Sequence, residues 1–130
     1  MTTLLSRKLI LGAAIGLFSQ FALAQTDGET KALKQIADIV AGLNHFPSDG
    51  DMTTLEEIMS GADISQTVLI MADTVANIEH AANEEGKGAM AAIQASAQAS
   101  ESAKVLAKVI EQLSHTASAD AKNMLAQTFP

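Results

Sequence analysis

The sequence contains no cysteine, tryptophan or tyrosine, and it has only two prolines. Without cysteine the chain forms no disulfide, no thiolate site, no structural Cys–zinc site and no covalent haem attachment. Beyond residue 24 the only aromatic residues are Phe46 and Phe129, so Ala, Met, Leu, Ile and Val must supply the packing. Such a composition suits closely spaced helices and suits strands poorly. The sequence therefore predicts an all-α protein held by its own core or by partners.

The N-terminal segment has the layout of a secretory signal peptide. Arg7 and Lys8 precede an apolar run over residues 9–24 that ends in the small-x-small pattern of Ala22 and Ala24. The run is short for a membrane-spanning helix, which needs ~20 apolar residues, although a retained anchor is the alternative. Cleavage after residue 24 predicts a periplasmic or secreted protein with no stable membrane anchor. We expect a flexible leader at 25–29 and a single helical-repeat domain at 30–130.

Basic residues are scarce once the signal is removed. Loss of Arg7 and Lys8 leaves 6 lysines against 15 acidic residues, a formal net charge of −9, with no arginine. Binding to phosphate groups depends on clustered lysine and arginine. We therefore expect neither nucleic-acid binding nor attachment to an anionic membrane surface.

A histidine returns every 35 residues, and several other positions keep the same spacing without a gap. The aligned rows are His45, His80 and His115; Ile36, Met71 and Leu106; Ala37, Ala72 and Ala107; Val40, Val75 and Ile110; Leu55, Met90 and Leu125. Self-similarity at a fixed period indicates repeated supersecondary units. Two-helix units at this period stack into a small α-solenoid or close into a compact helical bundle, with about six helices in total.

Each unit is expected to contain a long helix of ~16 residues and a short helix of ~10 residues. The long helices are predicted to end at the histidines and to span residues 30–45, 65–80 and 100–115, with Thr30, Ser65 (or Asp63) and Ser100 as caps. The short helices are predicted to begin with side-chain caps at one register position, Ser48, Asn83 and Ser118. Gly86 and Gly88 should weaken the second short helix by roughly 1 kcal/mol each.

The favoured interpretation of the histidines is structural and assigns no metal. A histidine that ends a helix can bond its last carbonyls, and together with the following caps these residues would form a repeat turn: His45, Ser48, His80, Asn83, His115 and Ser118. The alternative is a metal site made of His80 with either His45 or His115, because neighbouring helices pack ~8–10 Å apart. In a stack the first and third histidines are too distant to share one ion. Glu79 is not expected to face His80, since adjacent residues do not share a helix face.

The sequence contains no nucleophile elbow, phosphate loop or nucleotide-binding turn. We therefore expect a protein that is not an enzyme and has no cofactor, with a binding or scaffolding role through the repeat surface and an unidentified protein partner. A periplasmic metal or small-ligand carrier that uses the repeated histidines is the first alternative. An accessory subunit of a larger envelope complex is the second. The last helix lacks a polar outer cap, so Phe129 either packs back or mediates self-association through the C-terminal helix.

Overall fold

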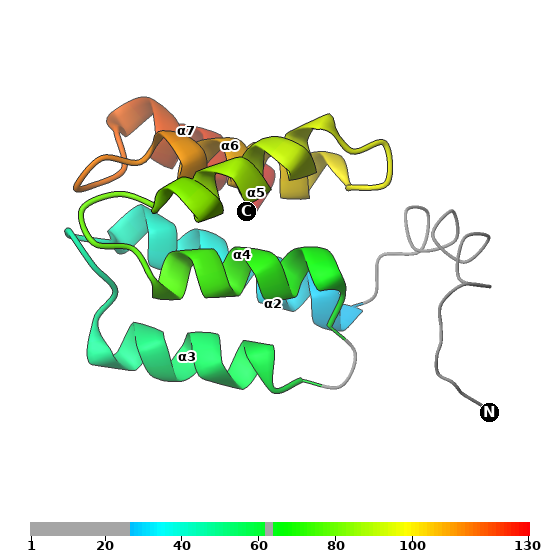
Figure 1. Cartoon of the computed structure of the whole chain (residues 1–130), viewed down its shortest axis with the longest axis horizontal. Coiled ribbons are helices and arrows are strands. Elements are labelled where there is room, and N and C mark those ends of the chain that lie inside the picture. Colours follow the sequence, from blue (N-terminus) through cyan, green and yellow to red (C-terminus); the bar gives the residue numbers. More distant parts are fainter. Residues whose placement is uncertain (1–26, 62–63) are drawn as a thin grey trace.

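A computed structural model describes residues 27–61 and 64–130, and over these residues the chain is all-helical and has no strand. The predicted fold class is confirmed. The helices are α2 (Asp27–Gly42), α3 (Asp49–Met59), α4 (Gln66–Ala76), α5 (Glu84–Ala95), α6 (Glu101–Gln112) and α7 (Ala119–Thr128) (Figure 1). The predicted signal peptide and residues 25–26 of the leader lie outside the described residues. None of these six helices has the length and apolar character that a membrane crossing requires.

The three two-helix units close into a ring. The first helices of the units, α2, α4 and α6, contact one another in all three pairs. Each second helix packs between the first helix of its own unit and the first helix of the next, so α3 contacts α4 and α5 contacts α6. The last helix completes the cycle because α7 contacts α2. Of the two arrangements that the repeat allowed, the chain therefore adopts the closed bundle, with approximate threefold symmetry.

The turns between the two helices of each unit gather at one end of the bundle. In Figure 1 the connections α2–α3, α4–α5 and α6–α7 lie side by side at the left. The first helices run towards this end and the second helices run away from it. The turns carry the three histidines, so ring closure brings together residues that are 35 and 70 positions apart in the sequence.

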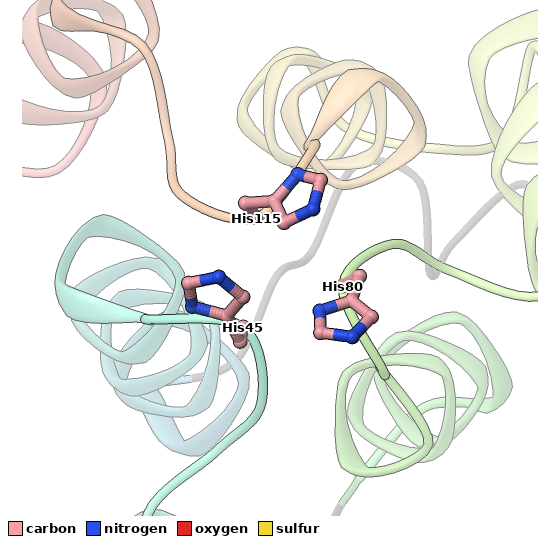
Figure 2. Close-up of side chains that lie close together, drawn as sticks. All are labelled: His45, His80 and His115. Carbon is pink, nitrogen blue, oxygen red and sulfur yellow. The ribbon is translucent and has the colours of Figure 1, made fainter.

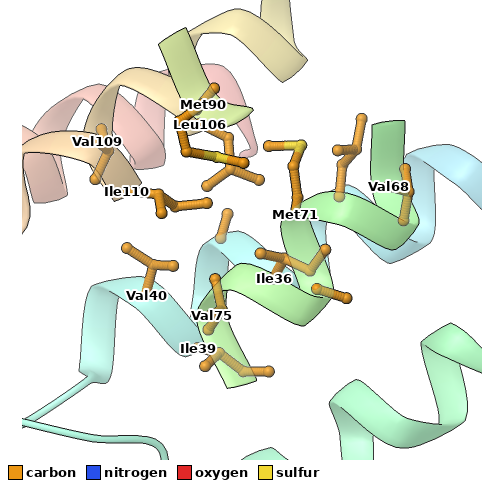
Figure 3. Packing of buried hydrophobic residues seen from close by; sticks show 14 of the residues in the cluster. Ile36, Ile39, Val40, Val68, Met71, Val75, Met90, Leu106, Val109 and Ile110 are labelled. Atoms are coloured by element: carbon orange, nitrogen blue, oxygen red, sulfur yellow. The ribbon is translucent and has the colours of Figure 1, made fainter. Parts of the chain in front are cut away.

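The core is formed by the aligned apolar rows. Ile36, Met71 and Leu106 are fully buried, and the other aligned apolar rows are buried with them (Figure 3). The alanine row is also buried, which lets the first helices approach each other closely. Phe129 packs back against the core, and its carbonyl oxygen accepts a hydrogen bond of 3.4 Å from Lys34 Nζ on α2. The C-terminus of α7 therefore joins α2 within the same chain.

The predicted caps of the second helices are confirmed. Ser48, Asn83 and Ser118 are extended N-cap residues whose side chains accept a hydrogen bond from the backbone N–H three residues later. Ser65 and Ser100 cap α4 and α6 in the same way. These bonds satisfy N–H groups that have no partner within the helix.

The start of α2 differs from the prediction. The helix begins at Asp27, so residues 27–29 form its first turn instead of a flexible leader, and Thr30 is not its cap. Glu29 explains part of the extension, because its carboxylate accepts a hydrogen bond from the Ser65 hydroxyl at the start of α4. A contact with the next unit thus favours helix at positions that the local sequence left undecided.

The predicted ends of the first helices at the histidines are wrong. α2, α4 and α6 end at Gly42, Ala76 and Gln112, three or four residues before the histidine of the unit. The expected contrast of long and short helices is present in the first unit, where α2 has 16 residues and α3 has 11, but it almost disappears in the other two units, since α4 and α6 have 11 and 12 residues. The backbone leaves the helix early because the histidine of each turn bonds to a different unit, as described below.

We predict opposite effects for the two glycines of α5. A Cβ at Gly86 would lie 2.8 Å from Cγ2 of Thr74, a buried residue whose hydroxyl is already bonded to the Ile70 carbonyl, whereas a Cβ at Gly88 meets nothing within 4 Å. Gly88→Ala should therefore stabilise the protein by about 0.5–1 kcal/mol through helix propensity. Gly86→Ala should destabilise it by about 1 kcal/mol or more, because α4 and α5 must separate. Urea unfolding of both variants measures the difference, and equal effects would contradict the close approach of the two helices.

Ring closure predicts that the chain tolerates circular permutation. A permutant that begins at Ser100, ends at Ala99 and joins Pro130 to Asp27 should fold with a melting temperature within a few degrees of the parent. Phe129 contacts Lys34, about two helical turns from Asp27, so a linker of about five Gly or Ser residues spans the gap. The control permutant opens α6 between Ala107 and Lys108 and should lose most of its stability. Thermal unfolding followed by circular dichroism measures the stability of both permutants. Two equally unstable permutants would show that α7 does not close the ring.

Candidate metal centre

The three histidines have a backbone conformation that L-residues seldom adopt. His45, His80 and His115 have φ angles of 71°, 72° and 69°, and they are the only non-glycine residues with positive φ in the described part of the chain. The left-handed region costs an L-residue roughly 1–2 kcal/mol, and glycine is the usual occupant. None of the described glycines occupies that region. The chain thus places an imidazole at all three positions where glycine would be conformationally easier.

The unusual conformation allows the three turns to join through their backbones. His80 N donates to the His45 carbonyl at 2.5 Å, His115 N donates to the His80 carbonyl at 2.5 Å, and His45 N donates to the His115 carbonyl at 2.6 Å. Each histidine gives one donor and one acceptor, so the three peptide groups form a closed cycle, here called the backbone ring. It satisfies polar groups that lie at the junction of three units. The histidines therefore do not end the first helices, as expected from the sequence. Their peptide groups form the backbone ring instead.

The imidazoles lie around a common centre on the same axis (Figure 2). The ring centroids are 5.1 Å apart for His45 and His80, 5.0 Å for His45 and His115, and 5.1 Å for His80 and His115. One nitrogen from each imidazole lies within 4.8 Å of the other two. The expectation that the first and third histidines are too far apart is wrong, because the units form a ring instead of a line.

These separations are close to those of three imidazoles bound to a single metal ion. Three imidazoles on one tetrahedral zinc, with Zn–N bonds of ~2.1 Å, place their ring centroids about 5 Å apart and their nitrogens about 3.4 Å apart. The centroid spacing is already met. The nitrogens, which lie within 4.8 Å of one another, would have to approach further, and rotation of the rings would move them in this direction. His80 and His115 are exposed and His45 is half-buried, so the side chains have room to rotate. Edge-to-face packing of aromatic rings produces similar spacings, so the distances alone do not identify a metal.

Hydrogen bonds outside the cluster orient two of the imidazoles. His45 Nδ1 lies 2.6 Å from Asn44 Oδ1, and because a carbonyl oxygen only accepts, this contact favours the tautomer with the proton on Nδ1 and the lone pair on Nε2. His115 Nδ1 lies 3.2 Å from the Ser114 hydroxyl. A partner on one ring nitrogen that fixes the tautomer of the other is typical of metal-binding histidines. In these two units the side chain before the histidine meets the imidazole, because the turn is not helical; the second unit has Glu79 at the corresponding position.

The charges near the turns favour a cation. No lysine lies within the three turns, and the last turns of α2, α4 and α6 contain no basic residue. The C-terminal ends of these helices, which carry partial negative charge, point towards the end of the bundle where the three turns lie. Acidic residues begin each second helix, Asp49, Glu84 and Asp120 among them, while Lys87 and Lys122 follow one turn later. The end of the bundle with the imidazoles is thus predominantly acidic.

The three units are otherwise diverged. When residues 30–60, 65–95 and 100–130 are aligned, only two positions are identical in all three units. One is the buried alanine row, which core packing explains. The other is the histidine row, which is largely exposed and which packing does not require. No family model, curated protein or solved structure matches the chain.

The sequence predicted which residues form the repeat turn, but it did not predict that the turns of all three units meet. The turn residues His45, Ser48, His80, Asn83, His115 and Ser118 all lie in or beside the three connections, and the caps act as expected. The missed feature is the left-handed backbone at the histidines, which has no glycine to signal it. The sequence did contain one indication of a special turn: histidine is present at this position in all three units, whereas the positions on either side of it vary.

We predict that replacing exposed histidines by glycine keeps the fold. His80→Gly and His115→Gly remove the conformational strain but preserve the backbone ring, so in the presence of a chelator stability should be unchanged or higher by up to about 1 kcal/mol. His80→Val is the matched control, because a β-branched side chain tolerates positive φ poorly; it should destabilise the protein by about 1–2 kcal/mol. Urea unfolding measures all three. Large destabilisation by glycine would show that contacts between the imidazoles hold the turns.

Proposed function

We propose that this chain is an exported protein that binds one transition-metal ion, zinc in the first instance, through His45, His80 and His115. The observation that carries the proposal is the convergence of three imidazoles from separate units, with one nitrogen of each within 4.8 Å of the others. Neutral imidazole is a common ligand of zinc, copper and nickel. The strained backbone at all three positions supports a role for the side chains, since strain of this kind tends to gather at functional sites.

The site favours binding over catalysis. In the part of the chain that the structure describes, the metal-competent group contains three imidazoles and no carboxylate that could serve as a general base. The largely exposed position suits an ion that is taken up and released. A carrier or buffer of transition metal outside the cytoplasm is therefore the activity that we propose.

A binding or scaffolding role through the repeat surface, or as an accessory subunit, is the second proposal. Phe46 supports it, because this large apolar side chain is 61% exposed on the turn next to His45. Ring closure weighs against it. An elongated repeat array offers a concave binding face, whereas here the last helix packs against the first. Metal binding is accordingly the proposal that the geometry supports better.

We predict that the mature chain, purified without a histidine tag, binds one zinc ion per chain in calorimetry. His80→Gly should weaken binding at least tenfold, and the variant that also carries His115→Gly should show no binding, because a single exposed imidazole holds zinc weakly. Thr116→Ala is the control, since it changes the same turn but leaves every imidazole. Zinc at about 100 times its Kd should raise stability by about 2.7 kcal/mol.

The absence of heat with micromolar zinc, copper and nickel would contradict the metal proposal. A melting temperature that neither metal nor chelator changes would contradict it independently. If both results were obtained, the structural-turn interpretation of the histidines would stand.

A further inference from the structure

The protein supplies three ligands to the proposed ion and no fourth. The cluster contains only the imidazoles of His45, His80 and His115, and no carboxylate among the described residues belongs to it. Zinc and cobalt in such sites take four ligands, and a site with three protein ligands leaves the fourth position for an external molecule. An external ligand would therefore complete the coordination of the ion.

The position of the backbone ring determines where the fourth ligand binds. One donor from each of the three units would place an ion near the axis of the bundle, so the remaining position would also lie near this axis. The interior side of the axis is closed by the backbone ring and by the core, to which the buried residues two positions before the histidines belong: Leu43, Ile78 and Leu113. The outer side is flanked by the exposed His80 and His115. The fourth position consequently faces out of the bundle.

The surrounding charges select among the molecules that could occupy this position. Glu79 precedes His80, and the second helices begin with Asp49 and Asp51, with Glu84 and Glu85, and with Asp120. Lys87 and Lys122 offset only part of this negative charge. The carboxylates weaken the attraction of the dication for an approaching anion, whereas they leave the binding of a neutral donor nearly unchanged.

We propose that the fourth position is an exchangeable site for a neutral nitrogen donor of the imidazole class. The inference rests on the proposed metal function and specifies how the ion would be passed on: a histidine side chain of another protein can join the ion while the three imidazoles still hold it. Water occupies the position when no such donor is present.

The test uses the mature chain loaded with Co²⁺, whose visible spectrum reports the ligands of the ion. Binding of Co²⁺ is established first, by calorimetry without any added ligand. Imidazole and azide are then titrated separately at equal ionic strength. We expect imidazole to shift the spectrum with a saturating one-to-one curve, to leave Co²⁺ bound after gel filtration, and to bind at least several-fold more tightly than azide.

Glu79→Gln tests the electrostatic selection. Loss of one carboxylate beside the site should improve azide binding about two- to fivefold and leave imidazole binding unchanged. Glu57→Gln is the matched control, because it removes the same charge near the far end of α3 and should change neither titration.

Three results would overturn the inference while leaving metal binding intact. Imidazole could leave the spectrum unchanged, azide could bind as tightly as imidazole, or imidazole could remove the cobalt from the protein. Failure of Co²⁺ to bind in the first step would overturn both the inference and the proposed function, so the two failures are distinguishable.

Discussion

The structure depends on a cycle of three hydrogen bonds between the peptide groups of His45, His80 and His115. Each unit contributes one donor and one acceptor, so the cycle is complete only with all three units present. The bonds use backbone atoms alone, which explains why the residues on either side of the histidines vary without loss of the arrangement. They also require the chain to leave the helix before each histidine, and this fixes where α2, α4 and α6 end.

The sequence predicted those features that depend on local chemistry or on the period. Ser48, Asn83 and Ser118 cap helices because a short polar side chain before a helical segment satisfies free N–H groups wherever the segment lies. The rows of Ile36 and Val40 are buried because their spacing puts them on one helix face. The ends of the first helices were not predictable in this way. They are set by a bond to another unit, and no glycine marks the left-handed turn.

Closure of the ring was beyond sequence reasoning for a related reason. A 35-residue unit can bury the same residues against its neighbour in two arrangements. Successive units can stack in a line, or each unit can be rotated by about a third of a circle relative to the one before it. The choice depends on the angle between successive units, which is set by contacts between them such as that of Glu29 with Ser65. The repeat predicted a pairing of His80 with one other histidine as an alternative, but not a site of all three, because only closure places His115 beside His45.

One residue per unit thus performs two tasks that are separate in most folds. Its peptide group completes the backbone ring, and its side chain stands next to the axis that the ring defines. Glycine would perform the first task with less strain, so the ring alone does not account for histidine at all three positions. One ion can lie on this axis, and the three corresponding residues around the axis can each supply one ligand. The divergence of Asn44, Glu79 and Ser114 then gives each imidazole a different neighbour, so a symmetric frame holds three chemically inequivalent imidazoles.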